Sequence, residues 1–151
     1  MSGRVIGPAV GAGPTRGVER PFMLRGVRGA TTVREDSPAA IEAAVHELLR
    51  EIVARNGLDA DDLGAVFFSV PDDLRSAFPA AAARSFGWRH VPLLDVREAT
   101  TDDDLPRCLR ALLLWNTRRA PAEIRHVYLH AAAGLRPDLC GGLGDAAAFA
   151  G

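Results

Sequence analysis

The chain has 151 residues, of which 48% are hydrophobic, and its formal net charge is −1. This length and composition are enough for one domain with a hydrophobic core. The near-neutral charge argues against a nucleic-acid surface or a polybasic membrane patch, and no apolar run approaches the roughly 20 residues of a membrane-spanning helix. We therefore expect neither nucleic acid nor a membrane as a partner.

All 18 basic residues are arginine, because the sequence contains no lysine. This excludes a lysine Schiff base, a phosphate-binding Walker lysine and a lysine general base. Any anion site must use arginine, whose planar guanidinium matches a carboxylate with two parallel hydrogen bonds. The two cysteines, Cys108 and Cys140, are not spaced for zinc and argue against a disulfide framework. With only these two cysteines and no disulfide framework, the predicted location of the protein is the reducing cytoplasm.

Composition divides the chain into three parts. Residues 1–22 are rich in glycine and proline, lack hydrophobic periodicity and predict a flexible N-terminal extension rather than a signal peptide. Residues 23–138 contain all the periodic segments and predict the folded domain. Residues 139–151 are rich in glycine and alanine and predict a mobile tail.

The first predicted element is a strand over 23–33, which is rich in Val, Thr and Gly. Because side chains alternate across a strand, Arg28 shares a face with Gly26 and Ala30. Glycine in a strand often marks a place where a ligand or another backbone comes close. Arg28 is therefore either the floor of an anion-binding pocket or an ordinary surface arginine on an exposed sheet face.

A helix follows over 38–56. Ser37-Pro38 supplies an N-cap and a proline at the first helical position, and apolar residues recur after it at three- and four-residue spacing. Asn56-Gly57 ends the helix, with glycine suited to the left-handed position that follows a helix.

The later elements are shorter. We predict a strand at 64–70, a helix at 79–86, an edge strand at 90–94 that contains Pro92, an acidic loop at 100–104, a strand at 124–133 and a turn at 134–138. The segment 106–116 is a helix or a strand, because nearly all of its residues are apolar and periodicity does not decide. The order β-α-β-α-β-β-β predicts an α/β or α+β fold with a small mixed sheet.

Arg110 is the most conspicuous candidate for chemistry, because it sits inside the apolar run 109–115. A buried guanidinium must be paired or must bind an incoming anion. The two readings are a structural ion pair with a carboxylate such as Glu98 and a ligand-binding arginine. Glu98 itself is a lone acid that follows the third strand.

His126, Tyr128 and His130 share one face of the predicted last strand. The two histidines could begin a metal site, but no carboxylate lies in a recognisable ligand motif. The alternative to a metal site is that they are ordinary polar residues on a partly solvent-exposed face of the strand. The sequence also lacks a Gly-x-Ser-x-Gly elbow and a Gly-x-Gly-x-x-Gly loop, and Cys108 has no histidine beside it. The residues alone thus predict an anion-binding domain without a metal or cofactor.

Taken in order, these segments resemble the monofunctional chorismate mutases of the AroH class. The matching pieces follow family order and near-family spacing between Met23 and about Asp138. They are residues 25–33, Phe78-Pro79-Ala80 with Arg84, Gly87-Trp88, Val91-Pro92-Leu93, Glu98, Cys108-Leu109-Arg110, residues 124–129 and Leu135-Arg136-Pro137-Asp138.

The resemblance implies a small α/β domain with helices on one face of the sheet, which associates as a homotrimer with a barrel-like core. The active sites would lie in clefts between subunits. It also implies that 106–117 is a strand with Arg110 on the face of Cys108 and Leu112. The implied reaction is the Claisen rearrangement of chorismate to prephenate, a unimolecular step that needs no nucleophile, acid, base, metal or cofactor.

The resemblance further implies a role for each matching residue. Arg110 would donate to the ether oxygen and the enolpyruvyl carboxylate of chorismate. Arg28 and Tyr128 would hold that carboxylate, and Glu98 would accept a hydrogen bond from the ring hydroxyl. The implied substrate-binding residues are Phe78 in the pocket wall, Arg84 from a neighbouring subunit, Asp95 beside the ring hydroxyl and Arg136 by the tail that covers the mouth.

Three departures from the family pattern bear on affinity. Asp95 stands where some members have a neutral residue such as cysteine, Ala81 replaces a lysine seen in some relatives, and the loop 102–104 is unusually acidic. Two alternatives come from other functional classes. One is a non-catalytic trimeric anion-binding module of the same fold, and the other is a metal-dependent enzyme that uses His126 and His130.

Overall fold

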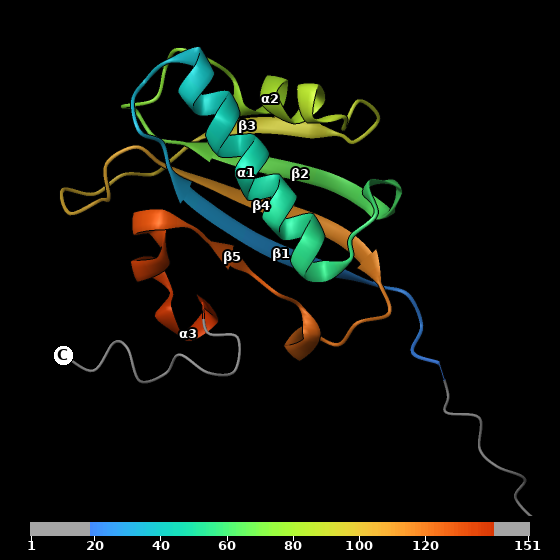
Figure 1. The fold of residues 1–151 in the computed structure, drawn as a ribbon. Coiled ribbons are helices and arrows are strands. Elements are labelled where there is room, and N and C mark those ends of the chain that lie inside the picture. Colours follow the sequence, from blue (N-terminus) through green and yellow to red (C-terminus); the bar gives the residue numbers. More distant parts are fainter. Residues whose placement is uncertain (1–18, 141–151) are drawn as a thin grey trace, which may run out of the picture.

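In the computed structural model of the chain, residues 19–140 are described, and five strands form one sheet in the order β3-β2-β4-β1-β5. Two helices, α1 and α2, lie on the same face of this sheet (Figure 1). The elements are β1 (Met23–Thr32), α1 (Pro38–Asn56), β2 (Leu63–Val70), α2 (Pro79–Phe86), β3 (Leu93–Arg97), β4 (Cys108–Thr117), β5 (Val127–Tyr128) and α3 (Pro137–Cys140). The extension predicted before residue 19 and the tail predicted after residue 140 lie outside the described residues.

The sheet is mixed. β4 is antiparallel to both of its neighbours, β1 and β2, whereas β3 is parallel to β2 and β5 is parallel to β1. The predicted class, a small mixed sheet with helices on one face, is thereby confirmed. β3 and β5 are the two opposite edges.

Local signals at both ends of α1 position the helix over the sheet. The Ser37 hydroxyl accepts a hydrogen bond from the backbone N–H of Ala40 at 3.2 Å, and Gly57 adopts the left-handed conformation at φ 61°. The apolar stripe of α1 is buried against β1, where the helix comes so close that a Cβ on Gly29 would lie 2.8 Å from Ile52 Cδ1. Gly29 therefore marks a close approach of the helix, on the face opposite to Gly26 and Arg28.

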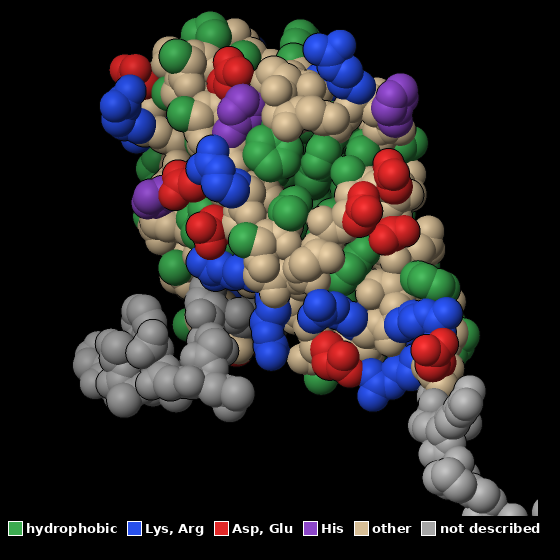
Figure 2. Space-filling view, turned by 45° about the vertical axis from the view of Figure 1, so that its right-hand side comes forward, with side chains coloured by type: hydrophobic (Ala, Val, Ile, Leu, Met, Phe, Trp, Pro, Cys, Tyr) green, Lys and Arg blue, Asp and Glu red, His purple; other side chains and the backbone are tan. Residues whose placement is uncertain are grey.

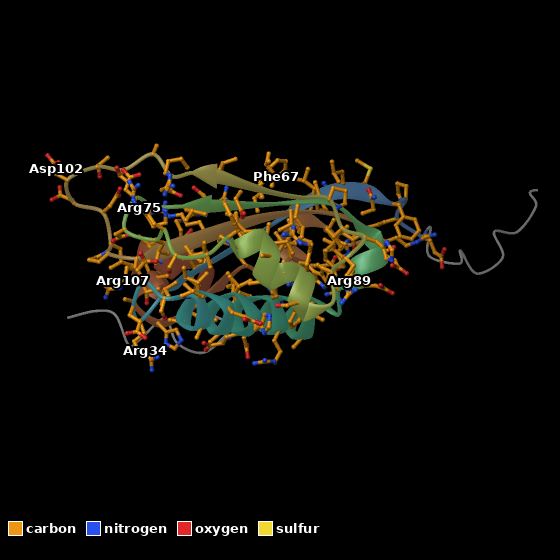
Figure 3. All side chains as sticks on the ribbon, turned by 90° about the horizontal axis from the view of Figure 1, so that it is seen from above. Arg34, Phe67, Arg75, Arg89, Asp102 and Arg107 are labelled. Atoms are coloured by element: carbon orange, nitrogen blue, oxygen red, sulfur yellow. The ribbon has the colours of Figure 1, made fainter. Side chains whose placement is uncertain are left out.

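Neither α1 nor α2 lies over the other face of the sheet, most of which is open within residues 19–140, although Ala132 packs against Ala30 and Cys108 at one end of it. Phe67 projects from this side in Figure 3. Hydrophobic side chains occupy it nonetheless, and several are exposed: Leu24 by 56%, Leu94 by 53% and Leu112 by 40%. We call Leu24, Phe67, Leu94, Val96 and Leu112 the open face. A sheet that is apolar on both faces is rarely left uncovered on one of them.

Two strands differ from the sequence expectations. β3 begins at Leu93 instead of His90, because Pro92 has no N–H to donate and contributes only its carbonyl, which accepts from Val66 N at 2.9 Å. It is an edge strand, as predicted. The residues of β4 form a strand, which is the choice that the family resemblance implied.

The prediction of a strand over 124–133 is wrong for most of its length. β5 contains only two residues, and the last bond to β1 runs from Leu129 N to Ala30 O at 2.9 Å. His130 then adopts φ 53° and starts a 3₁₀ helix, η3 (His130–Leu135). The strand ends there because a left-handed residue turns the chain away from the sheet.

None of the helices within residues 19–140 is long and apolar enough to cross a membrane. Acidic and basic side chains are interspersed on the face that Figure 2 shows, in keeping with the net charge of −1.

Asn56 ties the end of α1 to the segment before β5. Its amide nitrogen donates to Arg125 O at 2.8 Å, and its amide oxygen accepts from Arg125 N at 2.8 Å, in a fully buried position. We expect Asn56→Ala to lower the free energy of unfolding by about 2–3 kcal/mol, because the hydrogen bonds of the buried amide to both backbone groups of Arg125 are lost. Chemical denaturation measures this loss, and a decrease below about 0.5 kcal/mol would contradict it.

Candidate active site

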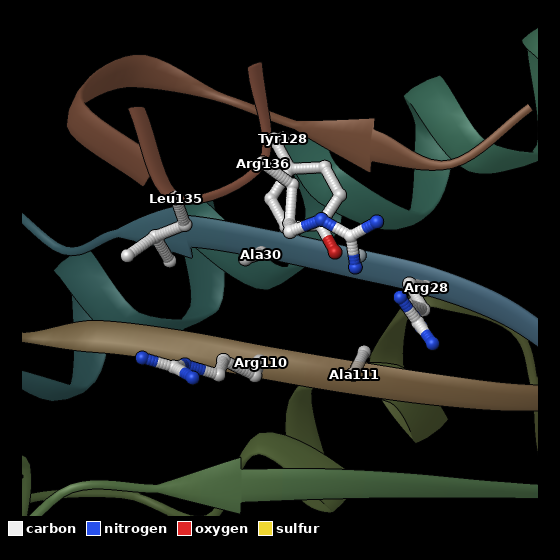
Figure 4. A pocket seen from close by; sticks show the side chains of 8 residues that line it. Arg28, Ala30, Arg110, Ala111, Tyr128, Leu135 and Arg136 are labelled. Atoms are coloured by element: carbon white, nitrogen blue, oxygen red, sulfur yellow. The ribbon is translucent and has the colours of Figure 1, made fainter. Parts of the chain in front are cut away.

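A row of side chains crosses the open side of the sheet. The strand register places Ser69 beside Arg110, Arg110 beside Ala30, and Ala30 beside Tyr128. Because Ala30 is so small, a gap remains between the Arg110 and Tyr128 side chains. The gap is a cavity of about 350 Å³ lined by Arg28, Gly29, Ala30, Arg110, Ala111, Tyr128, Leu135 and Arg136 (Figure 4).

The cavity is suited to an anion. Its lining side chains include three arginines and a tyrosine hydroxyl but no carboxylate. Arg28 comes from β1, Arg110 from the neighbouring β4, and Arg136 from the turn after η3 (Figure 4). Guanidinium groups from three elements that meet in one hollow can hold a ligand with more than one carboxylate.

The charge of Arg110 is partly balanced by the carboxylate of Glu98. Its Nη1 lies 3.6 Å from Glu98 Oε1, and the Glu98 carboxylate also accepts a hydrogen bond from the Ser69 hydroxyl. The Glu98 side chain is 14% exposed and that of Arg110 is 39% exposed. Arg110 Nε is buried and has no hydrogen-bond partner within residues 19–140. The ion pair of the first sequence reading therefore forms, and the second reading, a ligand-binding arginine, stays a prediction.

Arg136 is held at the cavity by its neighbour Asp138. The guanidinium donates to both carboxylate oxygens, at 3.0 and 2.8 Å. This pairing raises the pKa of Arg136 and lowers that of Asp138, so both groups are charged at neutral pH. Burial raises the pKa of the Cys108 thiol, which disfavours the thiolate that covalent catalysis would need.

Comparisons with known proteins agree with this geometry. The chorismate mutase AroH of Thermus thermophilus is 52% identical over 118 residues, which cover 78% of this chain and 97% of that protein. The chorismate mutase AroH of Bacillus subtilis is 37% identical over 119 residues, which cover 78% and 94%. A solved chorismate mutase from Clostridium thermocellum superposes with a TM-score of 0.71 at 38% identity, over 73% of this chain and 98% of that one.

The family model for chorismate mutase type I matches residues 24–139. The chain belongs to the chorismate mutase type I family. Membership confirms the resemblance found in the sequence, and with it the prediction that the chain is an enzyme with chorismate mutase function. The described fold places the residues that this family resemblance singled out in two separate groups.

The first group is the cavity on the open side, where Arg28, Arg110, Tyr128 and Arg136 lie together and Glu98 contacts Arg110. The second group lies by β3, at the opposite edge of the sheet from β5. There Phe78 and Asp95 line a different pocket, and Asp95 lies within electrostatic reach of Arg84 on α2. Phe78 is 73% exposed, so the described part of the chain leaves most of it uncovered.

Asp95 does not lie beside Glu98 within one chain. The register pairs Asp95 with the buried Phe68, on the helix-bearing face, whereas Glu98 reaches Ser69 and Arg110 on the open side. Asp95 Oδ1 accepts a hydrogen bond from Ala80 N at 3.0 Å and so caps α2, whose own N-cap residue makes no side-chain bond. Burial raises the pKa of Asp95 against the opposing effect of this bond.

The two candidate metal histidines are separated. His126 Nδ1 accepts from Arg28 N at 2.9 Å, whereas His130 lies beyond the strand with Nε2 at 3.1 Å from both oxygens of Glu47. No group of three potential metal ligands occurs in the part of the chain that the structure describes. The prediction that His126 and His130 share a strand face is wrong, because β5 ends before His130.

Sequence reasoning missed Ser69 as a site residue. The available signal was that Ser69 is the only polar side chain in the apolar run 65–70. A lone hydroxyl in such a run needs a partner, which here is Glu98.

Asp95→Asn should raise the melting temperature at neutral pH. The amide keeps an acceptor for Ala80 N without a partly buried charge. Because the carboxyl pKa is raised on folding, the wild-type unfolded chain ionises first and stability falls as the pH rises above 3.8. The gain over wild type should therefore be present at about pH 7 and shrink toward about pH 4. Calorimetry at both pH values checks this, and a lower melting temperature at neutral pH would contradict it.

Proposed function

We propose that the cavity beside Arg110 converts chorismate to prephenate, a step toward phenylalanine and tyrosine, by holding the substrate in its reactive conformer and stabilising its transition state. The observation that carries this proposal is the three-arginine hollow without a carboxylate in its lining, where Arg110 Nε has no hydrogen-bond partner among residues 19–140. Chorismate is a dianion, and its rearrangement is unimolecular. The enzyme's tasks are therefore conformational and electrostatic.

The roles proposed for the side chains are those that the family resemblance implies, and the positions of the residues support them. Arg110 donates to the ether oxygen, where negative charge develops as the carbon–oxygen bond breaks, and to the enolpyruvyl carboxylate. Arg28 and Tyr128, which line the same hollow, hold that carboxylate. Glu98 accepts a hydrogen bond from the ring hydroxyl, and its contacts with Arg110 and the Ser69 hydroxyl hold it beside Arg110.

We further propose that the enzyme is a homotrimer with sites between subunits. The cavity lies over β4, β1 and β5, whereas Phe78, Arg84 and Asp95 lie by α2 and the edge strand β3, so one chain does not bring them together. A second copy that packs on the open face would bury its exposed leucines and could bring its own Phe78 and Arg84 to the cavity of the first. Arg136 would lie at the mouth, and the cytoplasmic location stays a prediction from cysteine usage.

The test of the proposed function is the loss of chorismate absorbance after the purified protein is added. We expect turnover with a single product that behaves as prephenate. Binding of chorismate without turnover, measured by calorimetry, would favour the non-catalytic binding module. The absence of both would mean that the cavity recognises a different anion.

A further inference from the structure

The imidazole of His126 is built into the pairing between β1 and β5. Arg28 N donates to His126 Nδ1 at 2.9 Å, one residue before the backbone pairs Gly29–Val127 and Ala30–Tyr128. The ring thus takes the place of a backbone acceptor and extends the ladder by one hydrogen bond. Because Nδ1 accepts, the neutral ring carries its proton on Nε2.

This bond belongs to a series that holds the short β5 against β1. Upstream of the ring, Asn56 binds both backbone groups of Arg125. Downstream, Leu129 N donates to Ala30 O at 2.9 Å. Because β5 has only two residues, each of these hydrogen bonds contributes strongly to the alignment of β5 with β1.

The two residues that the imidazole connects lie at the cavity. Arg28 is bonded to the ring through its own backbone N–H, and Tyr128 follows His126 by two positions; both side chains line the hollow. We propose that His126 is a positioning residue that sets the spacing of Arg28 and Tyr128 through this bond. The inference rests on the proposed function, in which these two side chains hold the enolpyruvyl carboxylate.

The surroundings of the ring keep it neutral. The charged groups that act on it are Arg28 from β1 and Arg136 from the turn after η3, and Arg136 in turn is paired with Asp138. From α1, the uncharged Asn56 contacts the backbone of Arg125, the residue before His126. Burial, and then the two arginines, lower the pKa of His126 below its ordinary 6.5. A protonated ring would present an N–H to Arg28 N–H, and the bond would be lost.

Two uncharged substitutions distinguish the effect of the hydrogen bond to Arg28 N from the effect of losing the imidazole ring. In His126→Asn the amide oxygen can occupy roughly the place of Nδ1 and accept from Arg28 N. In His126→Gln the amide lies one bond further out, closer to the place of Nε2. We expect His126→Asn to keep kcat/KM within about threefold of wild type and His126→Gln to lose about tenfold, the usual effect of one such hydrogen bond.

The loss in His126→Gln should appear mainly in KM. The carboxylate held by Arg28 and Tyr128 is present in both substrate and transition state, so poorer alignment weakens both alike. A merely structural role would lower the melting temperature without separating KM from kcat. It would also affect the two variants alike.

A pH profile supplies a second readout. Wild-type kcat/KM should fall as the ring takes up a proton below 6.5, and His126→Asn should lack this acid limb. Equal kinetics for His126→Asn and His126→Gln, or the same acid limb in wild type and His126→Asn, would overturn the proposal.

Nitrogen NMR of the histidine rings tests the bond without any turnover. We expect the neutral ring of His126 to carry its proton on Nε2, and the opposite tautomer would overturn the inference. If the wild type fails to consume chorismate while this tautomer is observed, the proposed function fails and the bond stands. If the wild type is active and the two variants do not differ, the inference about His126 fails alone.

Discussion

Arg110→Ala should lose at least about a hundredfold in kcat, because removal of one donor to a developing oxyanion typically costs about 3 kcal/mol or more. Arg110 is the residue whose buried Nε has no partner in the described chain, and it lies in the row between Ser69 and Ala30. Loss of the side chain also leaves Glu98 without its cation. Chorismate absorbance measures kcat and KM for the variant.

The matched control is Arg55→Ala. Arg55 is an exposed arginine near the end of α1, where it pairs with Glu51 one turn away, and it has no contact with the cavity. Such surface pairs contribute little, so we expect wild-type kinetics. A near-normal kcat for Arg110→Ala, in a protein that melts as the wild type does, would show that the ether oxygen is stabilised by another group.

Leu94→Glu should convert the proposed trimer into monomers. Leu94 lies on the open face at the edge strand β3 and is 53% exposed in the single chain, so the substitution leaves the core of the domain intact. In an assembly that covers this face, the new carboxylate would be buried without a partner, which costs several kcal/mol. Sedimentation measures the oligomeric state.

Turnover should fall with the assembly, because the monomer cannot bring Phe78 and Arg84 to the cavity of another chain. Ala54→Glu adds the same charge at an exposed position of α1, on the covered face of the sheet, and should stay trimeric and active. A monomeric Leu94→Glu with full activity would show that one chain contains a complete site. An unchanged trimer would show that the open face is not the interface.

Local chemistry made several elements predictable. The two ends of α1 depend on Ser37-Pro38 and Asn56-Gly57, whose caps form where the sequence places them. The order of strands and helices was predictable for the same reason. The strand β4 was not predictable from local signals, because its side chains are apolar on both faces of the sheet. One set packs under the helices, and the other set belongs to the open face. A strand with two apolar faces has no period of two for sequence reading to detect.

The family resemblance, and with it the enzyme class, came from the sequence, because residues spread over the chain matched a known order. The position of each matching residue in space, however, depends on the tertiary structure. Arg110 meets Ala30 and Tyr128 because β4, β1 and β5 lie side by side, although they are distant in the chain. Asp95 and Glu98 are only three residues apart, but Asp95 lies on the helix-bearing face of the sheet, whereas Glu98 reaches Arg110 on the open side.

The sequence by itself therefore determined the elements with local signals, the absence of any lysine chemistry and the family. Only the tertiary structure decided that β5 is two residues long, that His126 completes its pairing with β1, and that the site residues form two separate groups. The physical reason is that caps and turns are bonds between near neighbours in sequence. Strand register and the faces of a sheet depend on residues that only folding brings together.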